Sequence, residues 1–112
     1  MGLHDNSIII FTTDHGEMMG ANDVRSRDKQ IFWDEAAKVS FLIRYPRIGK
    51  NAGKETLTPI TTPDILPTML SLANIPIPRS IEGENISSVV KNPLINKERA
   101  GLYMSIYPFA IT

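Results

Sequence analysis

The chain has 112 residues, of which 42% are hydrophobic, so it is long enough for one small globular domain or part of a larger one and too apolar for a disordered segment. Twelve basic and twelve acidic residues cancel, so we expect neither nucleic acid nor an anionic membrane as a partner. The absence of cysteine excludes disulfides, thiolate metal sites and a cysteine nucleophile. No apolar run approaches the roughly 20 residues that cross a bilayer. No secretory signal is visible at the N-terminus, and the compartment stays open.

The first predicted element is a buried strand over residues 7–12, because three β-branched isoleucines and Phe11 follow one another there. The strand leads directly into Asp14, His15 and Gly16. In open α/β sheets ligands bind at the carboxyl ends of strands, and a glycine lets the backbone turn sharply at that point. Asp14 and His15 are therefore candidate metal ligands. The alternative is a polar turn in which Asp14 caps the next helix.

The following segment is predicted to alternate between short helices and loops before a second strand. Residues 17–19 are expected to form one helical turn that Gly20 ends, and residues 21–29 an irregular loop. Residues 31–38 suit a short helix with aromatic anchors, and residues 39–45 a strand. The apolar positions of that strand are nearly continuous, which is typical of a strand covered on both faces.

Residues 46–54 carry three basic side chains, two glycines and a proline, and they predict a surface loop. We interpret the basic run as a solvated turn, with an anion site as the alternative. Residues 56–60 are expected to form a short third strand.

The clearest helix is predicted to begin with Asp64 as its N-cap, which places Pro67 at the third helical position, where its missing N–H costs little. Asn74 is expected to end the helix in a left-handed conformation. The apolar residues that follow helical spacing mark one buried face: Ile65, Leu66, Met69, Leu70, Leu72 and Ala73. Beyond the helix we expect a turn over residues 82–85, a short apolar segment over residues 86–90 and a strand over residues 100–106.

These elements predict an α/β fold of three or four strands and two or three helices. The near-continuous apolar strands need cover on both faces, and so few helices can hardly supply it. The sheet is therefore expected to continue into another piece of chain.

Three segments of the chain match a known family in order and spacing. The runs IIIFTTDHGEMMG, DKQIFWDEAAKVSFLIRYP and TPDILPTMLSLANIPIP resemble the sulfatase branch of the alkaline phosphatase superfamily, in the second half of its catalytic domain. The resemblance covers about residues 7–90. It implies that residues 1–112 are a partial sulfatase-like catalytic domain without the N-terminal part that bears the nucleophile. The implied fold is a partial mixed or parallel sheet flanked by helices, a fragment of an alkaline-phosphatase-like fold.

The resemblance also assigns roles to three residues. Asp14 and His15 fall on the family's later pair of metal ligands. The implied cofactor is a divalent cation, in the first place Ca²⁺, which prefers the hard oxygen of Asp14. His15 would suit Mn²⁺ or Zn²⁺ as well, and contact with a sulfate oxygen is its alternative role. Lys29 occupies the place of a lysine that contacts the sulfate group. The alternative for Lys29 is a solvated lysine in a loop.

The chain departs from the family in ways that affect the chemistry. Asn22 falls where many relatives have a second histidine, and an asparagine cannot act as a general acid near neutral pH. The family's nucleophile is a formylglycine made from a Cys/Ser-x-Pro-x-Arg motif, and no such motif occurs here. The early acidic metal ligands are absent too. The chain is therefore predicted to carry half of a site.

The function predicted from the sequence is that of a fragment of a sulfatase-like hydrolase, which cleaves sulfate esters with a divalent metal and is inactive until the missing half completes it. A phosphodiesterase or phosphonate monoester hydrolase of the same superfamily is the alternative within the enzyme class. A non-catalytic reading is a truncated product or an interaction module that self-associates through exposed sheet edges. A metal-binding module in its own right is a third reading.

Overall fold

The computed structural model describes residues 2–23, 29, 33–95 and 97–101. The chain divides into two compact units. The first contains Met1–Ile10 and Ile43–Gly101, and the second contains Phe11–Leu42 together with residues outside the described part. In chain order the helices and strands are η1 (Leu3–Asn6), β1 (Ile9–Phe11), η2 (Ala21–Asp23), α1 (Asp34–Ala37), β2 (Leu42–Arg44), η3 (Pro46–Asn51), α2 (Thr62–Leu72) and α3 (Ser87–Lys91), where η denotes a 3₁₀ helix.

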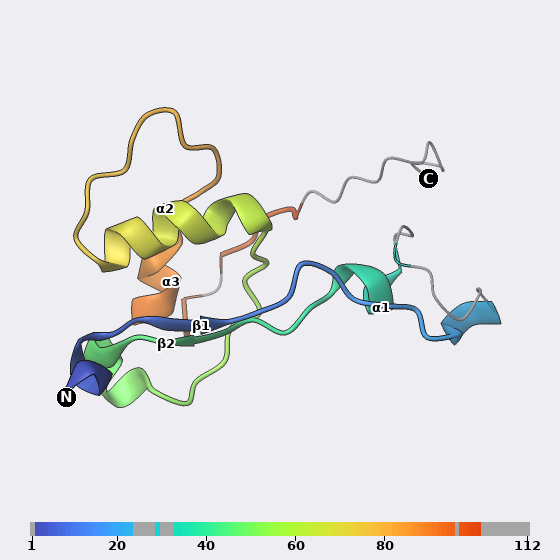
Figure 1. The fold of residues 1–112 in the computed structure, drawn as a ribbon, viewed down its shortest axis with the longest axis horizontal. Coiled ribbons are helices and arrows are strands. Elements are labelled where there is room, and N and C mark those ends of the chain that lie inside the picture. Colours follow the sequence, from blue (N-terminus) through green and yellow to red (C-terminus); the bar gives the residue numbers. More distant parts are fainter. Residues whose placement is uncertain (1, 24–28, 30–32, 96, 102–112) are drawn as a thin grey trace. The chain divides into compact units, whose positions relative to one another are not determined.

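The two strands pair with each other in an antiparallel sheet (Figure 1). Both are shorter than predicted, and the described residues contain no parallel pair, so the parallel part of the expected sheet stays a prediction. Their expected cover on both faces is incomplete, because Ile9 is 52% exposed, Phe11 65% and Leu42 63%. The strands therefore have the sequence pattern of strands covered on both faces, but the described residues cover only one face of the sheet.

A small apolar cluster forms the core of the first unit. Tyr45, Leu72 and Val90 are buried together, and Ile8, just before β1, and Ile43 of β2 pack against them. The cluster joins the sheet to the helices α2 and α3. It also holds the chain at the start of β1.

The helix α2 begins three residues earlier than predicted. Its N-cap is Thr61, and Asp64 lies at the third helical position, where its carboxylate accepts the backbone N–H of Thr61 at 2.8 Å. The predicted N-cap at Asp64 is therefore wrong, because the Thr61–Asp64 pair forms a capping box and Pro63 suits the first turn. Pro67 consequently lies inside the helix rather than at its third position.

Pro67 has no N–H to donate to the carbonyl of Pro63, and the chain around Gly83 approaches the helix at this carbonyl. A Cβ built on Gly83 would lie 2.3 Å from the Pro63 oxygen, and the residue has a φ of +93°. Only glycine fits at this position for two reasons. A side chain would collide with the helix backbone, and any other residue would be strained at this positive φ.

The end of α2 agrees with the prediction. Asn74 has a φ of +57°, its N–H donates to Ser71 O at 3.1 Å, and Ile75 N–H donates to Leu70 O at 2.8 Å. This is a Schellman motif, which satisfies the last carbonyls of the helix.

The predicted buried face of α2 is largely wrong. Of its members only Leu72 is buried, whereas Leu66 is 52% exposed and Met69 38%. Polar contacts hold the inner face instead: Thr68 Oγ1 accepts the N–H of Ile86 at 3.0 Å, and the hydroxyls of Ser71 and Ser87 lie 2.9 Å apart. The helix α2 therefore faces α3 with Thr68 and Ser71 as well as with Leu72, and apolar periodicity alone predicted its inner face only in part.

Several shorter predictions meet different outcomes. Residues 17–19 do not form a helical turn; the 3₁₀ helix η2 follows them instead. The apolar segment 86–90 becomes the helix α3, while residues 56–60 are irregular and not a strand. Most of the predicted strand 100–106 and the start of the predicted helix 31–38 lie outside the described residues. No helix in the described part of the chain has the length and apolar character to span a bilayer.

Candidate functional site

The turn after β1 presents Asp14 and His15 next to each other at the surface of the second unit. Asp14 Oδ2 lies 3.5 Å from His15 Nε2, and the side chains are 83% and 35% exposed. Asp14 Oδ1 accepts hydrogen bonds from the Thr13 hydroxyl and from the His15 backbone N–H, both at 3.1 Å. The pKa of Asp14 is lowered from its ordinary value. The largest cause is the hydrogen bond from the Thr13 hydroxyl, followed by a backbone hydrogen bond and the neighbouring imidazole. Asp14 is therefore a carboxylate at neutral pH, open to solvent.

His15 is held in one orientation by the backbone. Its Nδ1 lies 2.7 Å from the carbonyl oxygen of Gly16. A carbonyl accepts and never donates, so this contact favours the tautomer with the proton on Nδ1 and leaves the lone pair on Nε2. Histidines that bind metals donate their other ring N–H in the same way. In the neutral ring, Nε2, which lies 3.5 Å from the Asp14 carboxylate, is therefore the nitrogen that can bind a cation.

Gly16 fixes the turn against the helix α1. Its N–H donates to the carbonyl of Ala36 at 2.8 Å, and a Cβ at this position would lie 1.9 Å from Glu35 O. The close approach of two backbones requires glycine here. It ties the turn that carries His15 to a helix that begins at Asp34, well beyond it in the chain.

Asp14 and His15 fit part of a cation site. An anionic oxygen and an oriented imidazole nitrogen are ligands that divalent cations take. Among the described residues no group of three or more His, Cys, Asp or Glu side chains gathers at one point. Two protein groups are fewer than a divalent cation normally has, so the pair is a partial ligand set.

The other predicted site residue, Lys29, is exposed. Residues 24–28 and 30–32 on either side of it lie outside the described residues, and its role as a sulfate contact stays a prediction. Asn22 has a left-handed φ of +55°, which asparagine tolerates better than most residues.

Glu17, which the sequence interpretation passed over, lies two residues after His15. Its Oε1 is buried and has no hydrogen-bond partner among the described residues. A carboxylate oxygen in that state costs free energy unless a donor or a cation reaches it. The one sequence feature that could have drawn attention to Glu17 is its position directly after Asp14-His15-Gly16.

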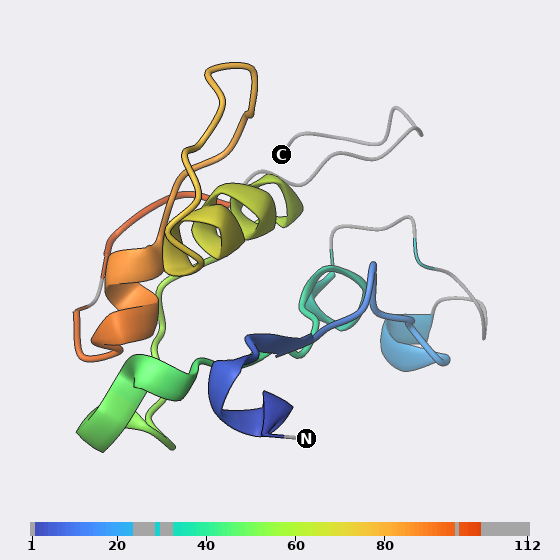
Figure 2. The same cartoon turned by 60° about the vertical axis from the view of Figure 1, so that its left-hand side comes forward.

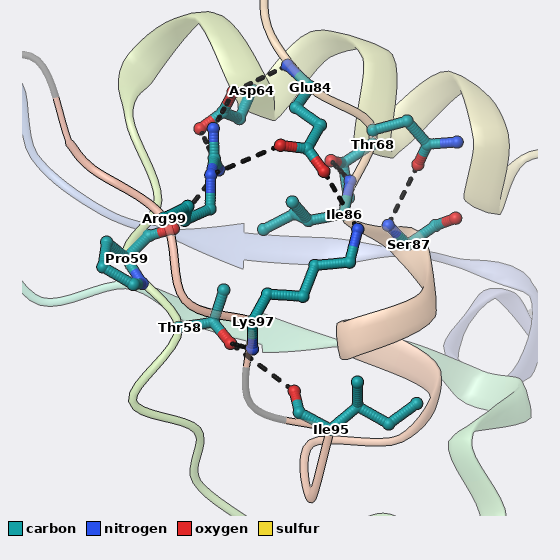
Figure 3. A network of polar contacts seen from close by, with 11 residues as sticks. Thr58, Pro59, Asp64, Thr68, Glu84, Ile86, Ser87, Ile95, Lys97 and Arg99 are labelled. Atoms are coloured by element: carbon teal, nitrogen blue, oxygen red, sulfur yellow. Dashed lines mark hydrogen bonds and ion pairs between the residues drawn. The ribbon is translucent and has the colours of Figure 1, made fainter.

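A second cluster of charged residues lies in the first unit, around Asp64 (Figure 3). Arg99 pairs with Asp64 through two hydrogen bonds, of 2.7 Å from Nη1 to Oδ2 and 3.1 Å from Nη2 to Oδ1. The Glu84 backbone N–H donates to Asp64 Oδ1 at 2.8 Å, and Lys97 pairs with the Glu84 carboxylate at 2.9 Å. Each Asp64 oxygen already has partners, so this cluster joins α2 to the chain after α3. Because Asp64 and Arg99 are 35 residues apart, no local pattern announced their contact.

The fold and the turn define an α/β chain with a carboxylate and an imidazole at the end of a strand. Comparison with known proteins identifies the family of this chain. Residues 1–75 match the Sulfatase family. The chain is 54% identical to an ulvan-active sulfatase of Formosa agariphila, over 98% of the chain and 22% of that protein. It is 32% identical to an N-acetylglucosamine-6-O-sulfatase of Bacteroides thetaiotaomicron, over 82% of the chain and 16% of that protein. It is 34% identical to arylsulfatase K of Bos taurus, over 77% of the chain and 15% of that protein.

The chain belongs to the sulfatase family, whose fold is of the alkaline-phosphatase-like α/β type. The resemblance noted in the sequence is thereby confirmed. The chain spans about a fifth of the length of the curated relatives that it matches. No solved structure matches it.

Proposed function

We propose that this chain is a portion of the catalytic domain of a sulfate-ester hydrolase, and that Asp14 and His15 supply part of its cation site. The observation that supports the proposal most is the ionised Asp14 carboxylate beside the free Nε2 of His15, in a chain that belongs to the sulfatase family. The names of the relatives, which include an ulvan-active and an N-acetylglucosamine-6-O-sulfatase, favour a sulfated carbohydrate as the substrate.

The cofactor that we propose is a divalent cation, with Ca²⁺ first and Mn²⁺ or Zn²⁺ as alternatives. Asp14 would hold it through a carboxylate oxygen and His15 through Nε2. A bound cation supplies positive charge that polarises the sulfate ester. The remaining ligands would come from other parts of a complete domain.

We propose two tasks for this chain's own residues during hydrolysis. Lys29 would contact the sulfate group and stabilise the negative charge that develops on it. Gly16, through its hydrogen bond to Ala36, would keep the Asp14–His15 turn in place. The formylglycine nucleophile of the family has no source in this sequence, because it lacks cysteine and a Ser-x-Pro-x-Arg motif. We therefore propose that the chain does not turn over substrate by itself.

A sulfatase assay with an aryl sulfate tests the proposal, on this chain and on a version extended upstream. We expect no turnover by the chain of 112 residues and turnover by the extended version. In the extended version Lys29→Ala should lower kcat about 10²-fold or more, as the loss of a charge-stabilising donor does. Lys38→Ala is the matched control, because Lys38 is exposed and paired with Asp34 on the surface.

Two outcomes would contradict the proposal. Turnover by the chain alone would contradict its dependence on a second part. Hydrolysis of an aryl phosphate diester in preference to the aryl sulfate would favour the phosphodiesterase alternative, since both substrates present a tetrahedral oxyanion.

The exposed side of β1 favours a second candidate, a non-catalytic module that binds a partner or itself. Ile9 and Phe11 point to the same side of the strand and are 52% and 65% exposed. The unpaired N–H and C=O groups of an open strand edge are a template for pairing with another chain. We expect the isolated chain to self-associate in analytical ultracentrifugation.

A lysine on this strand should prevent that association. We expect Ile9→Lys to shift the sedimentation distribution toward the monomer, since charges on exposed strands block edge pairing. Leu3→Lys is the control, because Leu3 is equally accessible, at 66%, but lies in η1. A monomeric wild-type chain with a sharp cooperative melt would refute the expectation.

A further inference from the structure

A basic surface lies in the first unit, which does not contain the Asp14–His15 turn. The 3₁₀ helix η3 and the turn after it carry Arg47, Lys50 and Lys54, all exposed. Ile48, between the first two, packs against the core cluster, and this contact anchors η3 to the unit. Left-handed glycines at positions 49 and 53, with φ of +59° and +72°, turn the chain on either side of Lys50. The three cations are thus attached to a segment that the core holds in place.

A fourth cation reaches the same surface from α3. Asn51 Nδ2 donates to the carbonyl of Lys91 at 2.9 Å, which joins the end of η3 to the end of α3. Figures 1 and 2 both show η3 beside α3. Lys91 is exposed. We call Arg47, Lys50, Lys54 and Lys91 the η3–α3 basic surface.

The charge of this surface is not neutralised locally. Residues 45–54 and 85–95 contain no aspartate or glutamate, and the nearest carboxylate in sequence is Glu55. None of the four cations forms an ion pair within the described residues, whereas Lys38, Lys97 and Arg99 each have a carboxylate partner. In a chain whose net charge is zero, a cluster of unpaired cations produces a local positive potential that attracts anions.

We propose that the η3–α3 basic surface binds a sulfated glycan through residues other than Asp14 and His15. The proposal rests on the proposed function, which makes a sulfated carbohydrate the substrate of the complete domain. Several exposed cations fit an extended polyanion better than one small ion, because each contact is weak and their number sets the affinity. The surface lacks an exposed aromatic residue for stacking on bases, since Tyr45 is buried. This favours a glycan over a single-stranded nucleic acid.

The test measures binding of dextran sulfate, with uncharged dextran of the same length as the reference, by the full chain at several salt concentrations. The variant Lys50→Gln/Lys54→Gln removes two charges from the surface. The matched control Lys38→Gln/Arg79→Gln removes two exposed charges elsewhere. We expect binding of dextran sulfate alone, weakening as salt rises, and a loss of about threefold to tenfold in affinity for the first variant with little change for the control.

The outcomes separate this proposal from its alternatives. Equal losses in both variants would show attraction to overall charge and would overturn the proposal. Binding of a DNA duplex or of anionic phosphatidylserine vesicles as tightly as dextran sulfate, at equal charge concentration, would overturn it as well. Because binding is measured without turnover, an extended chain that fails to hydrolyse aryl sulfate would refute the proposed function and leave this result intact. Single Lys50→Gln and Lys54→Gln variants, checked by their thermal melts, keep the test valid if the double variant unfolds.

Discussion

Replacing Asp64 by alanine is expected to lower the free energy of unfolding by about 3 kcal/mol, because it leaves the largely buried Arg99 guanidinium without its main carboxylate partner. The Asp64 side chain is 1% exposed and that of Arg99 16%. The substitution also removes the acceptor for the backbone N–H groups of Thr61 and Glu84. Urea denaturation followed by circular dichroism measures the loss.

Glu84→Ala is the matched control for this experiment. Glu84 contacts the same arginine at 3.5 Å, but its side chain is 49% exposed. An ion pair open to water contributes about 1 kcal/mol or less. Equal destabilisation by both variants would contradict a dominant role for the buried pair.

The same carboxylate makes stability depend on pH in a defined direction. Burial by itself raises the pKa of Asp64, but the hydrogen bonds from Arg99, the Glu84 N–H and Thr61 outweigh it and hold this pKa well below its ordinary value. A lowered pKa in the folded state stabilises the protein above the unfolded pKa of about 3.9. That stabilisation is lost as the pH falls from there toward the folded pKa.

The urea midpoint should therefore fall between pH 5 and pH 2, values chosen to bracket the unfolded pKa of about 3.9. Asp64→Asn should weaken this dependence, since it removes the titrating group while keeping its size. An unchanged pH profile in Asp64→Asn would show that other carboxylates account for the acid sensitivity.

Gly16→Ala is expected to destabilise the second unit by about 3 kcal/mol, at the upper end of the cost of overpacking. The new Cβ would meet the Glu35 carbonyl oxygen at 1.9 Å, and neither backbone can yield without breaking the hydrogen bond from Gly16 to Ala36. The turn with Asp14 and His15 would lose its attachment to α1. Trp33, at the N-cap of α1, reports the change through its fluorescence during urea denaturation.

Gly20→Ala separates crowding from backbone strain. Gly20 has a φ of +87° but no atom within 4 Å of an added Cβ. The control should therefore cost only the left-handed strain of about 1–2 kcal/mol. A Gly16→Ala variant as stable as the wild type would show that α1 does not hold this turn.

Local chemistry made some features predictable from the sequence. The run of β-branched residues before Asp14 placed β1, and Asn74 before Ile75-Pro76 placed the end of α2, because left-handed caps depend on residues in direct succession. The motif around Asp14 and His15 indicated the sulfatase family. Asp14 and His15 are adjacent in the chain, and at this turn their side chains lie 3.5 Å apart.

Contacts between distant residues decided the rest. The apolar spacing of α2 predicted only part of its inner face. The pairs Thr68–Ile86 and Ser71–Ser87 also lie on that face and involve positions that no period reveals. The sequence predicts Asp64 as an N-cap. Its ion pair with Arg99 forms only because folding brings the two residues together.

By itself, then, the sequence determined the family, the strand that ends at the Asp14–His15 pair and the stop of α2. The tertiary structure alone decided that Asp64 is a buried ion-pair partner, that Gly16 lies against α1, and that Lys91 joins the cations of η3. The physical reason is that capping and strand formation depend on neighbours in the chain, whereas burial, charge pairing and backbone approach depend on residues brought together only by folding.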